Sequence, residues 1–229
     1  MNKVVFEAIK ICKSFDKRRI LKNVSFRLHE GETIAIVGKS GCGKTTLLRI
    51  LANLEQPDSG EILFNNQPQK NPTSEIIFIQ QDYNQLLPWK NVINNVAYPA
   101  IATKKYSKAT AIKHAEQLLK KMDLAEFVSF FPRELSGGMK QRVAIARALI
   151  MEPKILLLDE PFGAVDRESR EKAYDIIKKL CNEYGTAVLV ITHNLQEAKK
   201  VARRIILFEN NNVKVITNKE LTKLLGDQT

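Results

Sequence analysis

The fold class is decided by the stretch TIAIVGKSGCGKT, residues Thr33 to Thr45. A short apolar run, Thr33 to Val37, leads into a glycine-rich loop, and the periodic run from Lys44 to Leu54 predicts a helix behind it. Glycines let successive backbone N–H groups converge on a phosphate, and the positive end of the following helix adds to the attraction. Strand, glycine loop and helix in this order predict a binding site for nucleotide phosphates.

Particular side chains of this loop have expected roles. Lys44 can reach the β- and γ-phosphates, and the Thr45 hydroxyl can ligate Mg²⁺. The alternative is a glycine turn that binds nothing, but the complete pattern in its expected context argues for ATP or GTP. The residues expected to surround the nucleotide here are Gly38, Ser40, Gly41, Cys42, Gly43, Lys44, Thr45 and Thr46.

A second apolar run ends in two acids. Ile155 to Leu158 is followed by Asp159 and Glu160. A carboxylate at the carboxyl end of a central strand faces the ligand crevice and can hold Mg²⁺ through water, which is the expected role of Asp159. Acids at strand ends are often merely solvated, but the accompanying glycine loop makes that alternative the weaker one.

A third stretch, LSGGMKQR at Leu135 to Arg142, begins another helical pattern. Ser136 is a natural N-cap for that helix, and Gly137 and Gly138 allow close backbone approach to a ligand. Taken alone, the stretch predicts only a capped helix.

Together, these three stretches resemble the motifs of the ATP-binding subunits of ABC transporters, and the match covers nearly all of the chain. The resemblance implies an α/β fold: a P-loop NTPase core of the ABC ATPase type with an inserted helical subdomain and an N-terminal antiparallel β-subdomain. In that family the run at Ser136, Gly137 and Gly138 binds the γ-phosphate of ATP held by another subunit, so that two subunits sandwich two nucleotides. Met139 stands where glutamine is commoner, and the hydroxyl and backbone contacts would survive that change.

The same resemblance gives roles to residues beyond the motifs. Glu160 would polarise the attacking water. Gln81 looks like the glutamine that touches Mg²⁺ and senses the membrane partner, although adjacent Gln80 leaves the register open by one. His193 matches the histidine that contacts the γ-phosphate. The expected catalytic residues are therefore Glu160, His193 and Lys44, and the expected metal ligands are Thr45, Gln81 and Asp159.

Two further matches leave alternatives open. Asp166 resembles the aspartate of the loop that crosses the dimer interface, and it is equally compatible with a helix N-cap. Phe15 fits the aromatic residue that stacks on adenine near the end of the first strand, but aromatic residues are mostly packing elements, so Phe15 could as easily belong to the core.

The chain is expected to form one domain over 1–229. Strand-like segments at Val4 to Ile11 and Ile20 to Leu28 open it, and strands alternate with helices again after Lys154. Residues 1–81 and 154–229 would form the α/β core with its β-subdomain, and 82–153 a mostly helical subdomain with helical patterns at 107–122 and 138–151. Asn194 with Glu197, and Thr217 with Glu220, predict capped helix starts.

Composition bounds the remaining possibilities. The net charge of +11 favours an anionic ligand such as ATP and tolerates an anionic membrane surface, and no nucleic-acid recognition element accompanies it. The apolar runs are too short to span a bilayer, and no secretory signal opens the chain. Three widely spaced cysteines show no metal-ligand pattern, so we expect reduced thiols. These features favour a soluble, intracellular protein. The resemblance to ABC ATPases implies that it is peripheral, at the cytoplasmic face of the cell membrane.

The expected function is ATP hydrolysis coupled to transmembrane transport. The run Leu86-Leu87-Pro88-Trp89 resembles the ATPases of nitrate, sulfonate and taurine importers, and an exposed loop there would suit docking of a membrane subunit; alternatively, Trp89 packs inside the helical subdomain. The expected partners are a second copy of the chain, membrane permease subunits and, indirectly, a solute-binding protein, with no nucleic acid. The competing hypotheses are an ABC-type ATPase of DNA repair, translation or assembly, and a generic P-loop kinase or GTPase.

Overall fold

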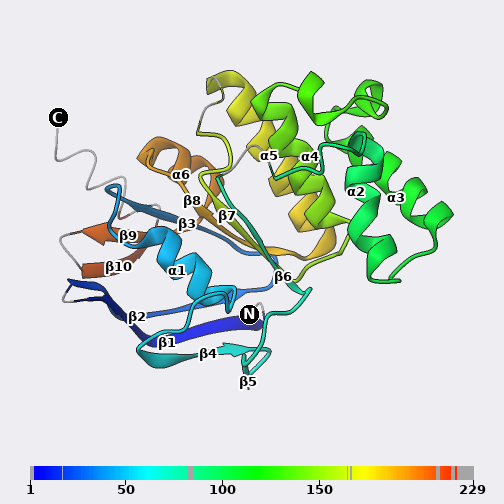
Figure 1. Ribbon diagram of the computed structural model, residues 1–229. Helices are drawn as coiled ribbons and strands as arrows, with labels where there is room; N and C mark the ends of the chain where they lie inside the picture. The colour runs from blue at the N-terminus through cyan, green and yellow to red at the C-terminus, as the bar shows by residue number, and fades with distance from the viewer. Residues whose placement is uncertain are drawn as a thin grey trace.

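The computed structural model describes residues 3–16, 18–81, 85–163, 165, 167–209, 212–217 and 220. Its strands form two sheets, one four-stranded in the order β2-β1-β4-β5 and one six-stranded in the order β10-β9-β3-β8-β7-β6 (Figure 1). The strands are β1 Val4–Phe15, β2 Arg18–His29, β3 Thr33–Gly38, β4 Ser59–Phe64, β5 Gln67–Pro68, β6 Ile76–Ile79, β7 Ile155–Asp159, β8 Ala187–Ile191, β9 Arg204–Glu209 and β10 Asn212–Thr217. The helices are α1 Lys44–Leu51, α2 Val92–Ala102, α3 Lys108–Lys121, α4 Gly137–Leu149, α5 Arg167–Tyr184 and α6 Leu195–Val201, with short 3₁₀ turns at Ala125–Phe127 and Pro132–Glu134.

The large sheet is buried on both faces, which explains its continuous apolar strands. Ile34 and Ile36 of β3 point to one face and pack with α1 and the strands of the small sheet. Ala35 and Val37 point to the other face and pack with side chains of α2, α4 and α5. Figure 1 shows the result: α1 lies between the two sheets, and the green and yellow helices cover the opposite face of the large sheet.

Four neighbouring strands of the large sheet set up the site. β3 pairs with β8, β8 with β7, and β7 with β6, all in parallel. Their carboxyl ends therefore lie at the same edge, where ligands bind in open α/β sheets. The glycine loop follows β3, Asp159 closes β7, and Gln81 and His193 follow β6 and β8.

The fold class is confirmed, and the differences from expectation are local. β1 and β2 run further toward each other than expected, and α1 stops at Leu51 instead of Leu54. Three elements were not foreseen: α2, the two-residue β5 and the edge strand β10. Among the described residues, no helix has the length and apolarity needed to cross a bilayer.

The predicted helix starts differ in detail. Thr217 and Glu220 exchange hydrogen bonds in both directions, as a capping box requires. Asn194 does cap α6 by accepting from the backbone N–H groups of Gln196 and Glu197. The Glu197 side chain does not accept from the backbone N–H of Asn194, however, because it accepts from Arg170 and Thr192 instead.

Candidate nucleotide site

The glycine loop folds around the ammonium group of Lys44. Its Nζ donates to the carbonyl oxygens of Gly38 and Lys39, both at 2.9 Å, and the residue is only 6% exposed. Since the loop follows β3 and α1 begins at Lys44, strand and helix fix both ends of this cradle. Thr46 lies half-buried in the first turn of α1.

Gly43 fixes the loop against the small sheet. Its φ is +106°, a conformation that L side chains rarely adopt, and a Cβ atom there would lie 2.5 Å from Cγ2 of Ile20 in β2. Two constraints therefore require glycine at position 43: the positive φ angle and the close contact of its backbone with Ile20.

Asp159 lies beneath the loop and contacts it through Thr45. The Thr45 hydroxyl donates to Oδ2 of Asp159 at 2.8 Å. Burial raises the pKa of the Asp159 carboxyl, the hydrogen bond from Thr45 lowers it, and the nearby charge of Glu160 raises it further. A hydroxyl and a carboxylate oxygen held together are the hard oxygen ligands that Mg²⁺ takes, so the residues present fit this ion.

Glu160 follows β7 and is approached by side chains from the two neighbouring strand ends, those of β6 and β8. Its Oε2 accepts from Nε2 of Gln81 at 3.3 Å and lies 3.5 Å from Nδ1 of His193. Its own φ is +44°, uncommon for a residue with a side chain. Gln80, the alternative to Gln81, instead offers its backbone carbonyl to Gln85 at 3.5 Å. Geometry therefore brings Gln81, Glu160 and His193 together.

An open cavity of about 700 Å³ lies beside the loop. Its wall includes Arg18 at the start of β2, a residue that the sequence analysis did not single out. Phe15 pairs with Arg18 in the β1–β2 register and is 47% exposed, with Nζ of Lys13 lying 5.4 Å from its ring centroid. The reading of Phe15 as a core residue is therefore wrong. The remaining lining residues are Val37, Gly38, Lys39, Ser40, Gly41, Cys42, His193, Leu195, Leu207 and Phe208.

The run at Ser136 forms the start of α4. Ser136 caps the helix by accepting from the backbone N–H of Met139 at 3.3 Å, and both Ser136 and Gly137 are exposed. Among the described residues, the lining of the cavity beside the glycine loop includes none of Ser136, Gly137 and Gly138. Asp166, predicted to cross a dimer interface, lies outside the described residues.

The predicted docking loop is exposed only in part. Leu86 is buried in the core, which corrects the expectation of a fully exposed Leu-Leu-Pro-Trp run. Its backbone neighbour Leu87 is held by Asn95 of α2, whose amide side chain bonds both the N–H and the carbonyl of Leu87. Trp89 is 71% exposed, so its alternative placement inside the helical region is wrong.

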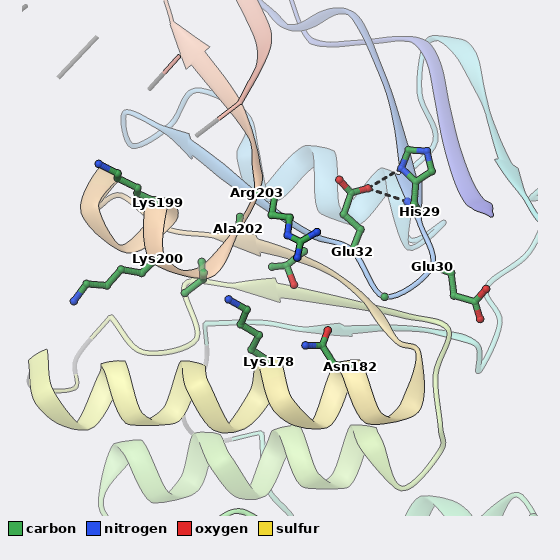
Figure 2. Close-up of a pocket in the computed structure, with 12 residues that line it drawn as sticks. His29, Glu30, Glu32, Lys178, Asn182, Lys199, Lys200, Ala202 and Arg203 are labelled. Atoms are coloured by element: carbon green, nitrogen blue, oxygen red, sulfur yellow. Dashed lines mark hydrogen bonds and ion pairs between the residues drawn. The ribbon is translucent and has the colours of Figure 1, made fainter. Parts of the chain in front are cut away.

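A second open cavity, of about 670 Å³, contains none of the predicted site residues (Figure 2). It lies between the β2–β3 turn, α5 and the end of α6, and Lys178 and Asn182 reach into it from α5. The Glu32 carboxylate in its wall is already held by Arg204, at 2.6 and 2.7 Å. α6 borders both cavities, because Leu195 lines the first and Lys199, Lys200 and Val201 line the second.

Comparisons with known proteins give the fold and site a family. The model of the ABC transporter family matches residues 21–163. The chain is 40% identical over 214 residues to the aliphatic sulfonates import ATP-binding protein SsuB 2 of Pseudomonas fluorescens, which covers 93% of this chain and 77% of that protein. It is 43% identical over 201 residues to SsuB 1 of Shouchella clausii, covering 88% of this chain and 76% of the relative.

Two solved structures share the fold. One is cbiO1 of Clostridium perfringens, part of the ABC transporter complex cbiONQ, with a TM-score of 0.88 and 26% identity over 97% of this chain and 92% of that one. The other is the ATP-binding cassette MJ0796, solved as a dimer in a post-hydrolysis state with ADP and Pi; its TM-score is 0.81 at 33% identity, over 93% of this chain and 98% of that one. With the glycine loop, the paired acids and this match, the chain belongs to the ABC transporter family and is an ATP-binding, ATP-hydrolysing member of it.

Proposed function

We propose that the chain powers an ABC importer: two copies sandwich two ATP molecules and drive a membrane permease that takes up an aliphatic sulfonate or a related small solute such as taurine or nitrate. The relatives named for aliphatic sulfonate import support the cargo class. The convergence of Gln81 and His193 on one carboxylate oxygen of Glu160 is the single observation that carries the catalytic assignment.

In this proposal Glu160 is the catalytic carboxylate. It polarises the water that attacks the γ-phosphate, and the contacts from Gln81 and His193 aim its Oε2. His193 is 61% exposed and close to the glycine loop in the cavity wall, which leaves it available to the γ-phosphate. Lys44 would exchange its two loop carbonyls for β- and γ-phosphate oxygens and so offset developing negative charge.

Thr45, Asp159 and Gln81 are the residues that would hold Mg²⁺. The direct hydrogen bond between Thr45 and Asp159 supports the first two, because it holds two oxygen ligands 2.8 Å apart. When bound, the ion supplies positive charge against the phosphate oxygens. Phe15 would stack on the adenine, a role that its exposed ring beside Arg18 supports.

The second copy completes each site in this account. Ser136 and Gly137 are exposed at the positive end of α4, so their hydroxyl and backbone N–H groups are free to meet a phosphate from outside the chain. The dimeric structure of the related cassette MJ0796 supports the two-copy arrangement. ATP then acts as a dimerisation switch, because it binds the closed pair better than the separated chains.

A groove between β6 and α4 is the proposed docking place for a permease helix. Its volume is about 280 Å³, and β6, Leu87, Tyr98 and one face of α4 line it. Arg147 of that face donates to the carbonyl oxygen of Gln85 at 2.9 Å, and exposed Trp89 follows closely in sequence. An apolar groove lined by an exposed aromatic residue, Tyr98, suits a helix anchored by side chains. Because Gln81 begins the same segment, docking there would reach the catalytic carboxylate.

Two broader assignments accompany this proposal. The chain would sit peripherally on the cytoplasmic face of the membrane and act with an extracytoplasmic solute-binding protein through the permease. Residues 82–153 would move as a helical subdomain relative to the core, carrying Ser136 and the α4 wall of the docking groove, whose other wall is β6 of the core. The contacts of α2 with α3 and α4, and of α3 with α4, support this division.

Uptake in the host distinguishes the alternatives. Loss of the chain should abolish uptake of labelled ethanesulfonate and leave sulfate uptake unchanged, and a tagged chain should co-purify a polytopic membrane protein. Loss of nitrate uptake alone would move the cargo to another class. Normal uptake of all these solutes, with nucleic acid or ribosomes co-purifying, would instead establish a non-transport ABC ATPase.

A further inference from the structure

His193 is poorly held by its own side chain. The ring is 61% exposed, and within the described part of the chain its polar contact is the 3.5 Å approach to Glu160. Its position is therefore set by the backbone on either side, at Thr192 and Asn194.

Both flanking residues are tied down. Thr192 is 3% exposed, and its backbone N–H donates to the carbonyl oxygen of Ile36 in β3 at 3.1 Å. Its hydroxyl accepts from the backbone N–H of Asn194 at 3.1 Å and donates to Oε2 of Glu197 at 2.6 Å. The segment that carries His193 thus depends on one carboxylate in the first turn of α6.

The other oxygen of that carboxylate is held from α5. Nη1 of Arg170 donates to Oε1 of Glu197 at 2.5 Å, and Nη2 donates to the carbonyl oxygen of Val165 at 2.6 Å. The two charged side chains are only 12% and 17% exposed. Water screens such a pair only weakly, and both side chains make further hydrogen bonds. The positions of the two side chains are therefore tightly restricted.

Val165 in turn touches the start of α4. A Cβ atom added to Gly138 would lie 3.1 Å from Cγ2 of Val165, so the two segments are already in close contact. A continuous chain of contacts therefore leads from the neighbours of His193 through Glu197 and Arg170 to Gly138.

We propose that the Arg170–Glu197 pair is a positioning device that fixes His193 relative to Val165 and the start of α4. The inference rests on the proposed two-copy site. In that site His193 contacts the ATP bound by its own chain, whereas Ser136 contacts the ATP bound by the second copy. The pair then couples the two nucleotide sites of the dimer. The position of His193 at one ATP depends on the position of the start of α4, which contacts the other ATP.

The first test separates hydrolysis from nucleotide binding. Thr192→Val removes the hydroxyl that bonds both Glu197 and the backbone N–H of Asn194, and it leaves no charge unpaired. It should lower kcat at least tenfold, since misplacement of a catalytic group by about 1 Å can cost roughly a hundredfold. The affinity for a fluorescent ATP analogue should stay within about twofold of the parent. Glu197→Ala, which removes both acceptors, should lower kcat likewise.

Lys200→Gln is the matched control. Lys200 pairs with Glu171 at 2.7 Å and also joins α6 to α5, but both side chains are exposed, in contrast to Arg170 and Glu197. Its kcat should equal that of the parent. Equal losses in Lys200→Gln and Thr192→Val, or an unchanged kcat in Thr192→Val, would overturn the proposal.

Two combinations test how the device acts. In a His193→Ala chain, assayed at high protein concentration, Thr192→Val should cause no further loss; an independent, multiplied loss refutes action through His193. Arg170→Lys has one ammonium for two acceptors, so in a Glu160→Gln chain it should raise the ATP concentration needed for half-maximal dimerisation, and an unchanged midpoint refutes the coupling. If the Glu160→Gln parent itself does not dimerise, the proposed function fails, while the His193 combination still decides the positioning role.

Discussion

Thr45→Val removes one partly buried hydrogen bond and nothing of comparable size. The hydroxyl donates to Oδ2 of Asp159 at 2.8 Å, and Asp159 is 6% exposed. A hydrogen bond to a charged group contributes about 1.5–3 kcal/mol, so the nucleotide-free protein should lose about 2 kcal/mol of unfolding free energy. For a chain of this size that loss lowers Tm by about 4–8 °C. Thr45→Ser keeps the hydroxyl and is the control.

The pH dependence of this loss has a fixed sign. Burial raises the pKa of Asp159, so its contribution to stability is favourable below the unfolded pKa and is lost as the pH rises through the folded one. Without the Thr45 donor the pKa of Asp159 rises further. The Tm difference between Thr45→Val and Thr45→Ser, measured by calorimetry without nucleotide, should therefore be largest at neutral pH and shrink on acidification. Equal Tm values at neutral pH, or a difference that grows toward acid pH, would refute the reasoning.

Three other changes test separate parts of the site. Alkylation of Cys42, half-buried in the glycine loop, should inhibit ATP hydrolysis and be slowed by ATP, with Cys42→Ala as the resistant control; a fully modified, fully active protein would contradict this. Phe15→Ala should raise KM for ATP roughly tenfold, the equivalent of a stacking energy near 1.4 kcal/mol, and Phe15→Trp should not, so identical KM values would remove Phe15 from the adenine site. Trp89→Ala should abolish co-purification of the permease without slowing ATP hydrolysis by the isolated chain, whereas exposed Tyr184→Ala should do neither; retention of the permease by Trp89→Ala would place the docking surface elsewhere.

The elements that the sequence predicted best are those buried on both faces. β3, β7 and β8 are continuous apolar runs because helices or strands cover both sides of their sheet. α2 was missed for two physical reasons. Pro99 lies inside it, and Asn95, polar in the sequence, is fully buried because its side chain bonds backbone groups around Leu87 and Lys90.

The site shows the same division between local and distant signals. Two contiguous motifs contain the residues that the sequence places well: Lys44 and Thr45, and Asp159 and Glu160. Each motif lies at the end of a single strand, so a local pattern is enough to reveal it. The Arg170–Glu197 pair joins residues 27 positions apart, and Glu197 was interpreted only as part of a helix cap. Arg18 enters the cavity wall through the pairing of β1 with β2, which no local pattern reveals.

The central claim is that each ATP site is completed by a second copy of the chain. Its most direct test is the molar mass of Glu160→Gln by light scattering after size exclusion, with and without ATP and Mg²⁺. We predict that nucleotide shifts the chain of 26.0 kDa to twice that mass, that ATP stays unhydrolysed in the complex, and that adding Ser136→Arg prevents the shift. A Glu160→Gln chain that binds ATP but keeps the same mass, or hydrolyses it at the parental rate, would contradict the account.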